Sequence, residues 1–184
     1  MKRACLSTMY GTGLIRIGPG TWGSLVAALI AYPILKFVPY GYLALTAGAV
    51  FFTWIGTVNC NRFMREFNTA HDPSEVVIDE LIGQWLTYSV WYGWLYLMAG
   101  SSDAARDLLN EVSASPLYLA LGFVFFRFFD IFKPWPISWA DRHIKGGFGV
   151  MFDDILAAIP AGSVLYIVYL FSPYLLGQPL EVMP

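Results

Sequence analysis

The sequence predicts an all-α membrane protein, a polytopic helical bundle with about five transmembrane helices. Two observations lead to this class. Apolar residues make up 57% of the chain and charged residues only 13%, whereas a soluble domain carries about 25% charged residues. The apolar residues also gather in runs that approach the roughly 20 residues needed to cross a bilayer. A chain of 184 residues with this many spans is expected to form a single membrane domain, residues 1–184.

Five apolar runs follow one another along the chain, and four of them carry no Asp, Glu, Lys or Arg. Pro33 and Arg127 shorten the uninterrupted apolar part of the first and fourth runs, so a count of four spans is the alternative. In chain order the predicted spans are Trp22–Val38, Tyr42–Val58, Leu81–Gly100, Leu117–Phe126 and Ile155–Leu176.

Outside the spans, the sequence predicts two further helical segments and two loops. The stretch SSDAARDLLNEVS, 101–113, is typical of a short amphipathic surface helix. The stretch NRFMREFN, 61–68, is expected to extend the second span into water, with Arg62 and Glu66 paired at i,i+4. Glycine and proline gather in 11–23 and 133–149, where irregular backbone is expected. Small residues at four-residue spacing allow close helix packing in the first and fifth spans: Ala27, Ala31, Ala157 and Ala161.

Basic residues are distributed unequally between the two sides of the predicted topology. With five spans, the first side holds the N-terminus and residues 59–80 and 127–154, and the second side holds the turn near Pro39, residues 101–116 and the C-terminus. Only Lys36 and Arg106 fall on the second side. Because positive charge accumulates on the cytoplasmic side, the first side is predicted to be cytoplasmic. Nine acids share that side, an excess that the rule for basic residues does not predict. The basic residues of the first side are Lys2, Arg3, Arg16, Arg62, Arg65, Arg127, Lys133, Arg142 and Lys145.

Acid doublets precede two of the predicted spans. Asp79-Glu80 stands before the third and Asp153-Asp154 before the fifth. Each doublet has an ordinary alternative interpretation as a helix cap, since acids complement the positive end of the helix dipole. In the aromatic stretch FFRFFDIFKPWP, 125–136, Arg127 and Asp130 are three residues apart, and the alternative there is a self-neutralised pair.

Taken together, the acids predict a cation site. Five carboxylates at one membrane level would repel one another unless a cation lay between them. Hard divalent ions prefer oxygen ligands, and Mg²⁺ commonly joins one or two carboxylates to a substrate phosphate. The predicted metal ligands are Asp79, Glu80, Asp130, Asp153 and Asp154. The cations nearby are then predicted to bind phosphate: Arg127, Lys133, Arg142 and Lys145.

The loop GPGTWGS, 18–24, is a further candidate for substrate binding. Gly18 and Gly20 permit close backbone approach, and Thr21 is expected to be the N-cap of the first span. The free backbone N–H groups at a helix start of this kind can bind an anion as readily as a capping side chain.

Other chemistries leave few signs in the sequence. Cys60 and Arg65 are one residue too close for the Cys-x5-Arg phosphatase motif, and neither an Asp-x-Asp-x-Thr motif nor a Walker or dinucleotide glycine motif occurs. His71 and His143 are isolated, and the cysteines Cys5 and Cys60 form no metal-ligand pair. Two other classes of function stay open: a small transporter or ion pathway, and a non-catalytic lipid-binding subunit.

The run FRFFDIFKPWPISWADRHIKGGFGVMFDDILAAIPAG, with GTWGS upstream and IDELIGQW between, resembles the phosphatidylglycerophosphatase A family over roughly 11–162. The resemblance implies Mg²⁺-dependent hydrolysis of phosphatidylglycerophosphate to phosphatidylglycerol at the cytoplasmic face of the bacterial inner membrane. By the resemblance the matching acids are Asp79, Glu80, Asp130, Asp141, Asp153 and Asp154, and the matching cations are Arg127, Lys133, Arg142 and Lys145.

The expected mechanism combines the interpretation of the residues with the resemblance to the family. Asp130, Asp79, Glu80, Asp154 and Lys133 are the predicted catalytic residues, and a bound Mg²⁺ is expected to neutralise the phosphate and activate a water molecule. Arg127 and Lys133 would stabilise charge on the phosphoryl oxygens, and Gly20 and Thr21 would orient the headgroup. Direct attack by water and an aspartyl-phosphate intermediate remain alternatives.

Overall fold

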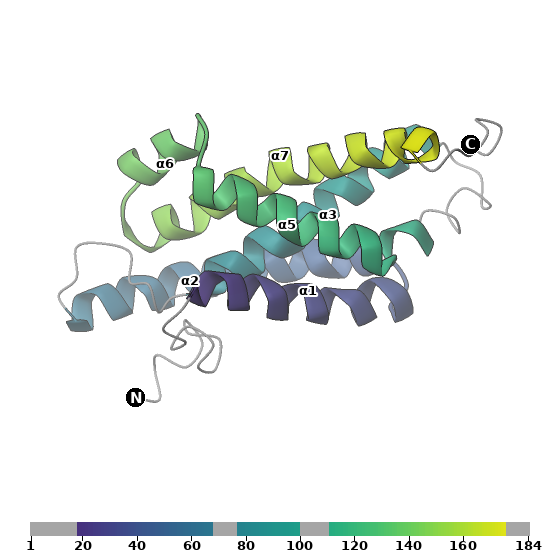
Figure 1. Ribbon diagram of the computed structural model, residues 1–184. Coiled ribbons are helices and arrows are strands. Elements are labelled where there is room, and N and C mark those ends of the chain that lie inside the picture. Colours follow the sequence, from purple (N-terminus) through teal and green to yellow (C-terminus); the bar gives the residue numbers. More distant parts are fainter. Residues whose placement is uncertain (1–17, 68–76, 100–110, 176–184) are drawn as a thin grey trace.

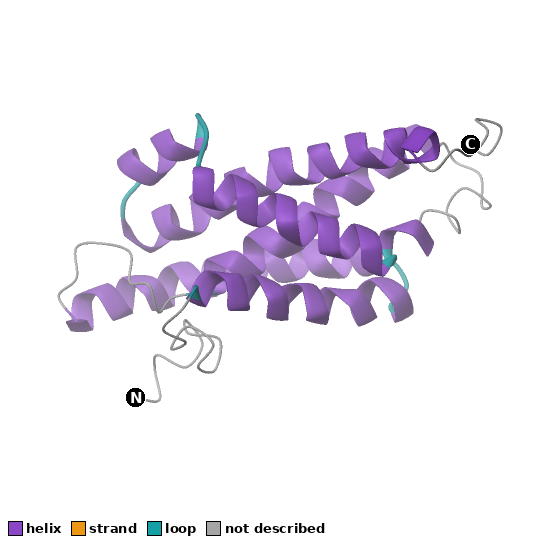
Figure 2. Cartoon of the chain, in the orientation of Figure 1, coloured by secondary structure: helices purple, strands orange, loops and turns teal. Residues whose placement is uncertain are grey.

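A computed structural model describes residues 18–67, 77–99 and 111–175, and the described residues are helical with no strand (Figure 2). The helices are α1 (Pro19–Phe37), α2 (Gly41–Phe67), α3 (Ile78–Ala99), α5 (Pro116–Phe132), α6 (Ile137–His143) and α7 (Gly146–Leu175). The predicted all-α fold is therefore confirmed. The predicted surface helix at 101–113 lies mostly outside the described residues, as does the Glu66 side chain of the predicted Arg62 pair.

The five long helices alternate in direction along the bundle (Figure 1). As a result, the starts of α1, α3 and α7 and the ends of α2 and α5 lie at the same end of the bundle, which we call the polar end. The short helix α6 lies at this end and packs against α7. The alternation expected from the sequence thus places the acid doublets of two helices at one level of the bundle.

Helix α3 is the centre of the bundle, because it packs against α1, α2, α5 and α7. Many of its large side chains are buried, including Ile82, Tyr88 and Trp91, and the exposed ones lie toward its C-terminal end. Small residues bring neighbouring helices close to it: Trp85 Nε1 donates to the Ala27 carbonyl of α1 at 3.0 Å. The alanines predicted to allow close packing, Ala27, Ala31, Ala157 and Ala161, are all fully buried.

Among the described residues, three segments are long and apolar enough to cross a membrane: Pro19–Phe37, Gly41–Arg65 and Gly146–Ser172. The predicted count of about five is not confirmed. Helix α5 has only 17 residues, and α3 is rich in Trp and Tyr and includes Gln84 among its buried polar groups. A central helix can carry such residues because other helices, rather than lipid, surround it. The three apolar segments indicate that the protein associates with a membrane.

Two helix starts differ from the sequence prediction. Gly18 is the N-cap of α1, with a left-handed φ of 59°, and Pro19 is the first helical residue. The prediction of Thr21 as N-cap is wrong, because Thr21 lies within the first turn and donates its backbone N–H to the Gly18 carbonyl at 3.0 Å. The prediction that the fifth helix starts after Asp154 is also wrong, since α7 begins at Gly146. The described part of the first predicted loop, residues 18–23, is therefore helical after Gly18, and the second, 133–149, is largely helical.

Candidate active site

Three carboxylates from two helices meet at the polar end. Asp79 and Glu80 lie in the first turn of α3, and Asp154 projects from α7. Each of the three offers an oxygen that lies within 4.8 Å of the others. Asp79 and Asp154 are only 7% and 3% exposed. Burying three acids this close is unfavourable unless protons or a cation compensate their charge.

The position of Asp153 and Asp154 weighs against the alternative that they are helix caps. They are the eighth and ninth residues of α7, counted from Gly146, and the helix dipole acts within the first turn. Asp79 and Glu80 do lie in a first turn, so capping and site formation are compatible there. Asp130 is a neighbour of Asp154 from a third helix, α5.

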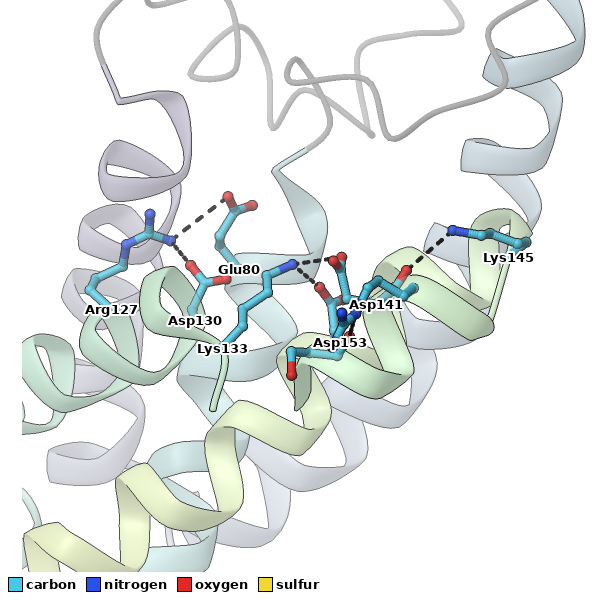
Figure 3. Close-up of polar contacts among 9 residues, drawn as sticks. Glu80, Arg127, Asp130, Lys133, Asp141, Lys145 and Asp153 are labelled. Atoms are coloured by element: carbon cyan, nitrogen blue, oxygen red, sulfur yellow. Dashed lines mark hydrogen bonds and ion pairs between the residues drawn. The ribbon is translucent and has the colours of Figure 1, made fainter. Parts of the chain in front are cut away.

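Arg127 joins α5 to the carboxylates of α3. Its Nη1 donates to Asp130 Oδ2 at 2.5 Å and lies 3.9 Å from Glu80 Oε1 (Figure 3). All three side chains are 13–15% exposed. The self-neutralised pair considered from the sequence is therefore present, but Arg127 also faces a second acid from another helix. Its guanidinium lies where it can contact an anion that reaches the carboxylates.

Lys133 holds a second group of acids. It follows α5 as the C-cap residue with a left-handed φ of 41°, and its Nζ donates to Asp141 Oδ1 at 2.8 Å and to Asp153 Oδ2 (Figure 3). Burial lowers the pKa of Lys133, but the hydrogen bonds to Asp141 and Asp153 outweigh it and raise this pKa well above its ordinary value. Lys133 is therefore a permanent cation beside the carboxylates of α7.

Gly20 brings the backbone of α1 against the site. A Cβ atom at this position would overlap Glu80 Oε1 and would lie 3.1 Å from Arg127 Nη1. Gly20 therefore brings the backbone of α1 close to the Glu80 side chain, and its role in binding substrate stays a prediction. Thr21, predicted to bind substrate beside it, is exposed.

The remaining predicted cations lie apart from the carboxylates. Arg142 is exposed and its Nε donates to the Ser138 carbonyl at 2.8 Å. Lys145 is exposed too, and its Nζ lies 3.4 Å from the Asp141 carbonyl (Figure 3). His143, also exposed, makes its hydrogen bond with Trp139 of the same helix. In the described residues, therefore, only Arg127 and Lys133 of the four predicted phosphate ligands contact the acids.

The sequence prediction left out two residues of the polar end. Gln84 lies one turn beyond Glu80, is fully buried and lies within hydrogen-bonding reach of the Tyr88 hydroxyl. Asn61 of α2 accepts the Gly147 N–H of α7 at 2.8 Å. Gln84 could have been noticed as a polar side chain four residues after an acid doublet, which is not a specific signal, and nothing in the sequence around Asn61 indicates its contact with Gly147.

The donor set suits a hard divalent cation. Carboxylate oxygens are the ligands that Mg²⁺ prefers, and Asp79, Glu80 and Asp154 have the separation of a shared site. Glu80 Oε2 and Asp154 Oδ2 are buried and lack a hydrogen-bond partner among the described groups. Buried polar atoms are normally satisfied, so these two oxygens are free to bind a cation or its water.

The chain was compared with known proteins. The family model of phosphatidylglycerophosphatase A matches residues 5–169. Phosphatidylglycerophosphatase A of Escherichia coli strain K12 is 34% identical over 163 residues, which cover 89% of this chain and 81% of that protein. The protein of the same name from Haemophilus influenzae is 30% identical over 161 residues, 88% of this chain and 85% of its own length.

A third relative has a different name. The protein from Bacteroides thetaiotaomicron, named as a candidate phosphatidylinositol-3-phosphatase, is 32% identical over 156 residues, 84% of this chain and 85% of its own length. No solved structure matches the chain. The family match extends from α1 through most of α7 and includes each helix that contributes a side chain to the carboxylates. The chain belongs to the phosphatidylglycerophosphatase A family.

Proposed function

We propose that this protein removes the terminal phosphate of phosphatidylglycerophosphate to give phosphatidylglycerol, with Mg²⁺ as cofactor, at the cytoplasmic face of the bacterial inner membrane. One observation carries the proposal beyond family membership. Buried carboxylates and two cations, contributed by α3, α5, α7 and the segment after α5, meet at one end of an apolar bundle. The acyl chains of a phospholipid would stay in the bilayer, while its phosphate would lie at that end.

The proposed cation ligands are Asp79, Glu80 and Asp154, with Asp130 and Asp153 beside them. When bound, Mg²⁺ supplies charge neutralisation for the phosphate and a water molecule of lowered pKa. The protein supplies orientation: the three carboxylates come from rigid helices rather than loops, so their separation is fixed before the substrate arrives.

Arg127 and Lys133 are proposed to bind the phosphoryl oxygens. Each already donates to carboxylates, Arg127 to Asp130 and Lys133 to Asp141. A phosphate that enters between these groups can take over some of those hydrogen bonds, and the bonds strengthen as charge develops in a loose transition state. Gly20 leaves room for the Glu80 carboxylate beneath the headgroup.

The decisive experiment is phosphate release from phosphatidylglycerophosphate by the purified protein, with Mg²⁺ and with EDTA. Asp130→Asn should reduce the turnover rate by at least about 100-fold while the protein stays folded in the membrane. Glu111→Gln is the matched control, because Glu111 is exposed and precedes the start of α5 at the opposite end. No turnover by the wild-type protein would favour the lipid-binding subunit, and full activity of Asp130→Asn would remove Asp130 from the site.

Trapping of a phosphoenzyme during turnover decides between water and aspartate as the attacking group. A phosphoenzyme that survives acid quench in wild type, is cleaved by alkali or hydroxylamine and carries its phosphate on Asp130 would assign the nucleophile to Asp130. A transporter is disfavoured because the charged side chains gather at the polar end rather than along a path through the described bundle.

A phosphatidylinositol phosphate is a second candidate substrate. The specific observation is the Bacteroides thetaiotaomicron relative, whose identity to this chain falls between those of the two phosphatidylglycerophosphatases. Phosphate release from both lipids at equal concentration measures the preference, expressed as the ratio of kcat/KM values.

A further inference from the structure

The short helix α6 lies at the same level of the bundle as the carboxylates. Its Ile137 and Ala140 are buried, and Ile137 belongs to a core cluster with residues of α5 and α7. Asp141 of α6 accepts a hydrogen bond from Lys133, whose Nζ also donates to Asp153 of α7 (Figure 3). Because one amine joins the two acids, α6 is held beside the acidic part of α7.

Large apolar side chains are exposed on and before α6. Trp135, in the turn that precedes the helix, is 80% exposed, and Trp139 within it is 48% exposed. The last two turns of α5 carry three more exposed apolar side chains, those of Phe128, Ile131 and Phe132. Exposed apolar side chains therefore recur from α5 through the turn into α6. Such groups mark a contact with a partner or with a membrane, and Trp prefers the interface between lipid and water.

Two cations of the same segment are not paired with acids. Arg142 and Lys145 are exposed, and each contacts only a backbone carbonyl of its own segment, at 2.8 Å and 3.4 Å. No ion pair joins either of them to an acid of the described ranges, and the nearby Asp141 is paired with Lys133. Arg142 is three residues after Trp139, so the two share a helix face. Basic residues beside Trp are typical of a helix that lies on a membrane surface.

We propose that residues 135–145, which we call the α6 segment, form a contact with the phospholipid headgroup layer. In this contact Trp135 and Trp139 insert among the headgroups, and Arg142 and Lys145 bind headgroup phosphates while they stay in reach of water. Since α6 is held beside the acids of α7, the contact places the carboxylates at headgroup depth. The inference concerns membrane lipid in general and does not depend on the proposed activity.

Lipid is favoured over a protein as the partner of the α6 segment. Three segments of the described chain are long and apolar enough to cross a membrane, so lipid already surrounds the bundle. The exposed apolar side chains of α5 lead directly into the segment. Two unpaired cations next to two Trp side chains complement a layer that combines phosphates with the beginnings of acyl chains.

The depth of two nitroxide labels tests the proposal. In a full-length protein without Cys5, the label is attached to Trp135→Cys or, as the matched control on the same segment, to Arg142→Cys. Both positions are exposed, so neither substitution removes a core contact, and Cys60 is buried. In phosphatidylcholine vesicles, collisions with oxygen and with a neutral nickel complex measure each depth, calibrated with nitroxide lipids. The label at position 135 should lie at or below the phosphates, and the label at position 142 nearer to water.

Two results would overturn the inference. One is a label at position 135 that collides with the nickel complex as often as the label at position 142 does. The other is shielding of position 135 that disappears when the protein is diluted in lipid, because that result would assign the surface to a second copy of the chain. Neither result depends on turnover, so both would leave the proposed function intact.

Lipid selectivity tests the two cations. The wild-type protein should retain spin-labelled phosphatidylserine in preference to spin-labelled phosphatidylcholine, because each cation near the surface favours an anionic headgroup about fivefold. Arg142→Gln/Lys145→Gln should reduce this preference. Arg62→Gln/Arg65→Gln is the matched control, since both residues are exposed near the end of α2 and remove the same charge. The control should keep the preference, and an equal loss in both double variants would overturn the assignment of Arg142 and Lys145 to headgroup phosphates.

Discussion

Single residues of the site act through close contact as well as through charge. Gly20 is buried, and the space of its missing side chain is taken by the Glu80 carboxylate, with Arg127 Nη1 3.9 Å from that carboxylate. A carboxylate confined in this way has little freedom to move from its position beside Asp79 and Asp154. The glycine is therefore required by the site rather than by the backbone of α1.

Gly20→Ala should displace Glu80 and lower kcat/KM by about 100-fold, since a shift of 1 Å can have this effect. The free energy of unfolding should fall by about 1–3 kcal/mol from overpacking. Gly93→Ala in α3 is the control, because a Cβ there meets no atom within 4 Å. That variant should keep full activity and gain slightly in stability from helix propensity. Equal activity of the two variants would contradict the role of Gly20.

Lys133 contributes stability with a defined pH dependence. Its hydrogen bonds to Asp141 and Asp153 raise its pKa above the ordinary value despite partial burial. For a base whose folded-state pKa is raised, the contribution is complete below the unfolded-state pKa of about 10.4 and is lost as pH rises through the folded-state pKa. The stabilisation by Lys133 should therefore be constant across neutral and mildly alkaline pH.

Lys133→Met should lower the free energy of unfolding by about 1.5–3 kcal/mol, the range for hydrogen bonds to charged groups. Thermal unfolding in detergent should give the same difference from wild type at about pH 8 and pH 9.5. Lys145→Met is the control, as Lys145 is exposed and contacts a backbone carbonyl at 3.4 Å. A difference that disappears between these two pH values would mean that the Lys133 amine is already neutral there.

At the scale of the helices, the sequence predicted the contents of the site better than the helix boundaries. The acid doublets and the Arg127–Asp130 spacing were visible because charges are rare in apolar runs. The start of α7 was missed because Gly146, Gly147 and Gly149 favour a loop by propensity. Tertiary contact overrides that preference: a Cβ at Gly147 would overlap the Thr57 carbonyl, so only glycine permits this crossing with α2.

Asn61→Ala tests whether this crossing positions the site. Asn61 Oδ1 accepts the Gly147 N–H, one of the N-terminal amides that has no partner within its own helix. Its removal should cost about 1–3 kcal/mol of unfolding free energy and lower kcat, because Asp153 and Asp154 follow on the same helix. Asn59→Ala is the control, since Asn59 donates to Ile55 within α2. Unchanged stability and kcat in Asn61→Ala would show that α7 is positioned by other contacts.

At the scale of the whole molecule, the charges are concentrated at one end and the apolar surface is spread along the bundle. Alternation of the helices could be predicted from the sequence, and with it the convergence of Asp79, Asp130 and Asp154. The central position of α3 could not, because an aromatic helix inside a bundle has the same composition as one at a membrane interface. This ambiguity, together with the 17-residue length of α5, explains why five spans were predicted whereas three segments of the described chain meet the requirements of length and hydropathy.

The proposed orientation predicts opposite accessibility for the two ends. In a protein without Cys5, a cysteine placed at exposed Arg142 of α6 should react with a membrane-impermeant maleimide in inverted vesicles, in which the cytoplasmic face is outward. A cysteine at Tyr40, which is 71% exposed in the turn between α1 and α2, should react in intact spheroplasts instead. Buried Cys60 should react in neither preparation.

Labelling of both engineered positions from the same side would contradict the alternating arrangement of the helices. A complete reversal of the labelling pattern would keep the bundle and place the site on the outer face. The orientation follows from the excess of Lys and Arg at the polar end, so adding basic residues beside Tyr40 should weaken it.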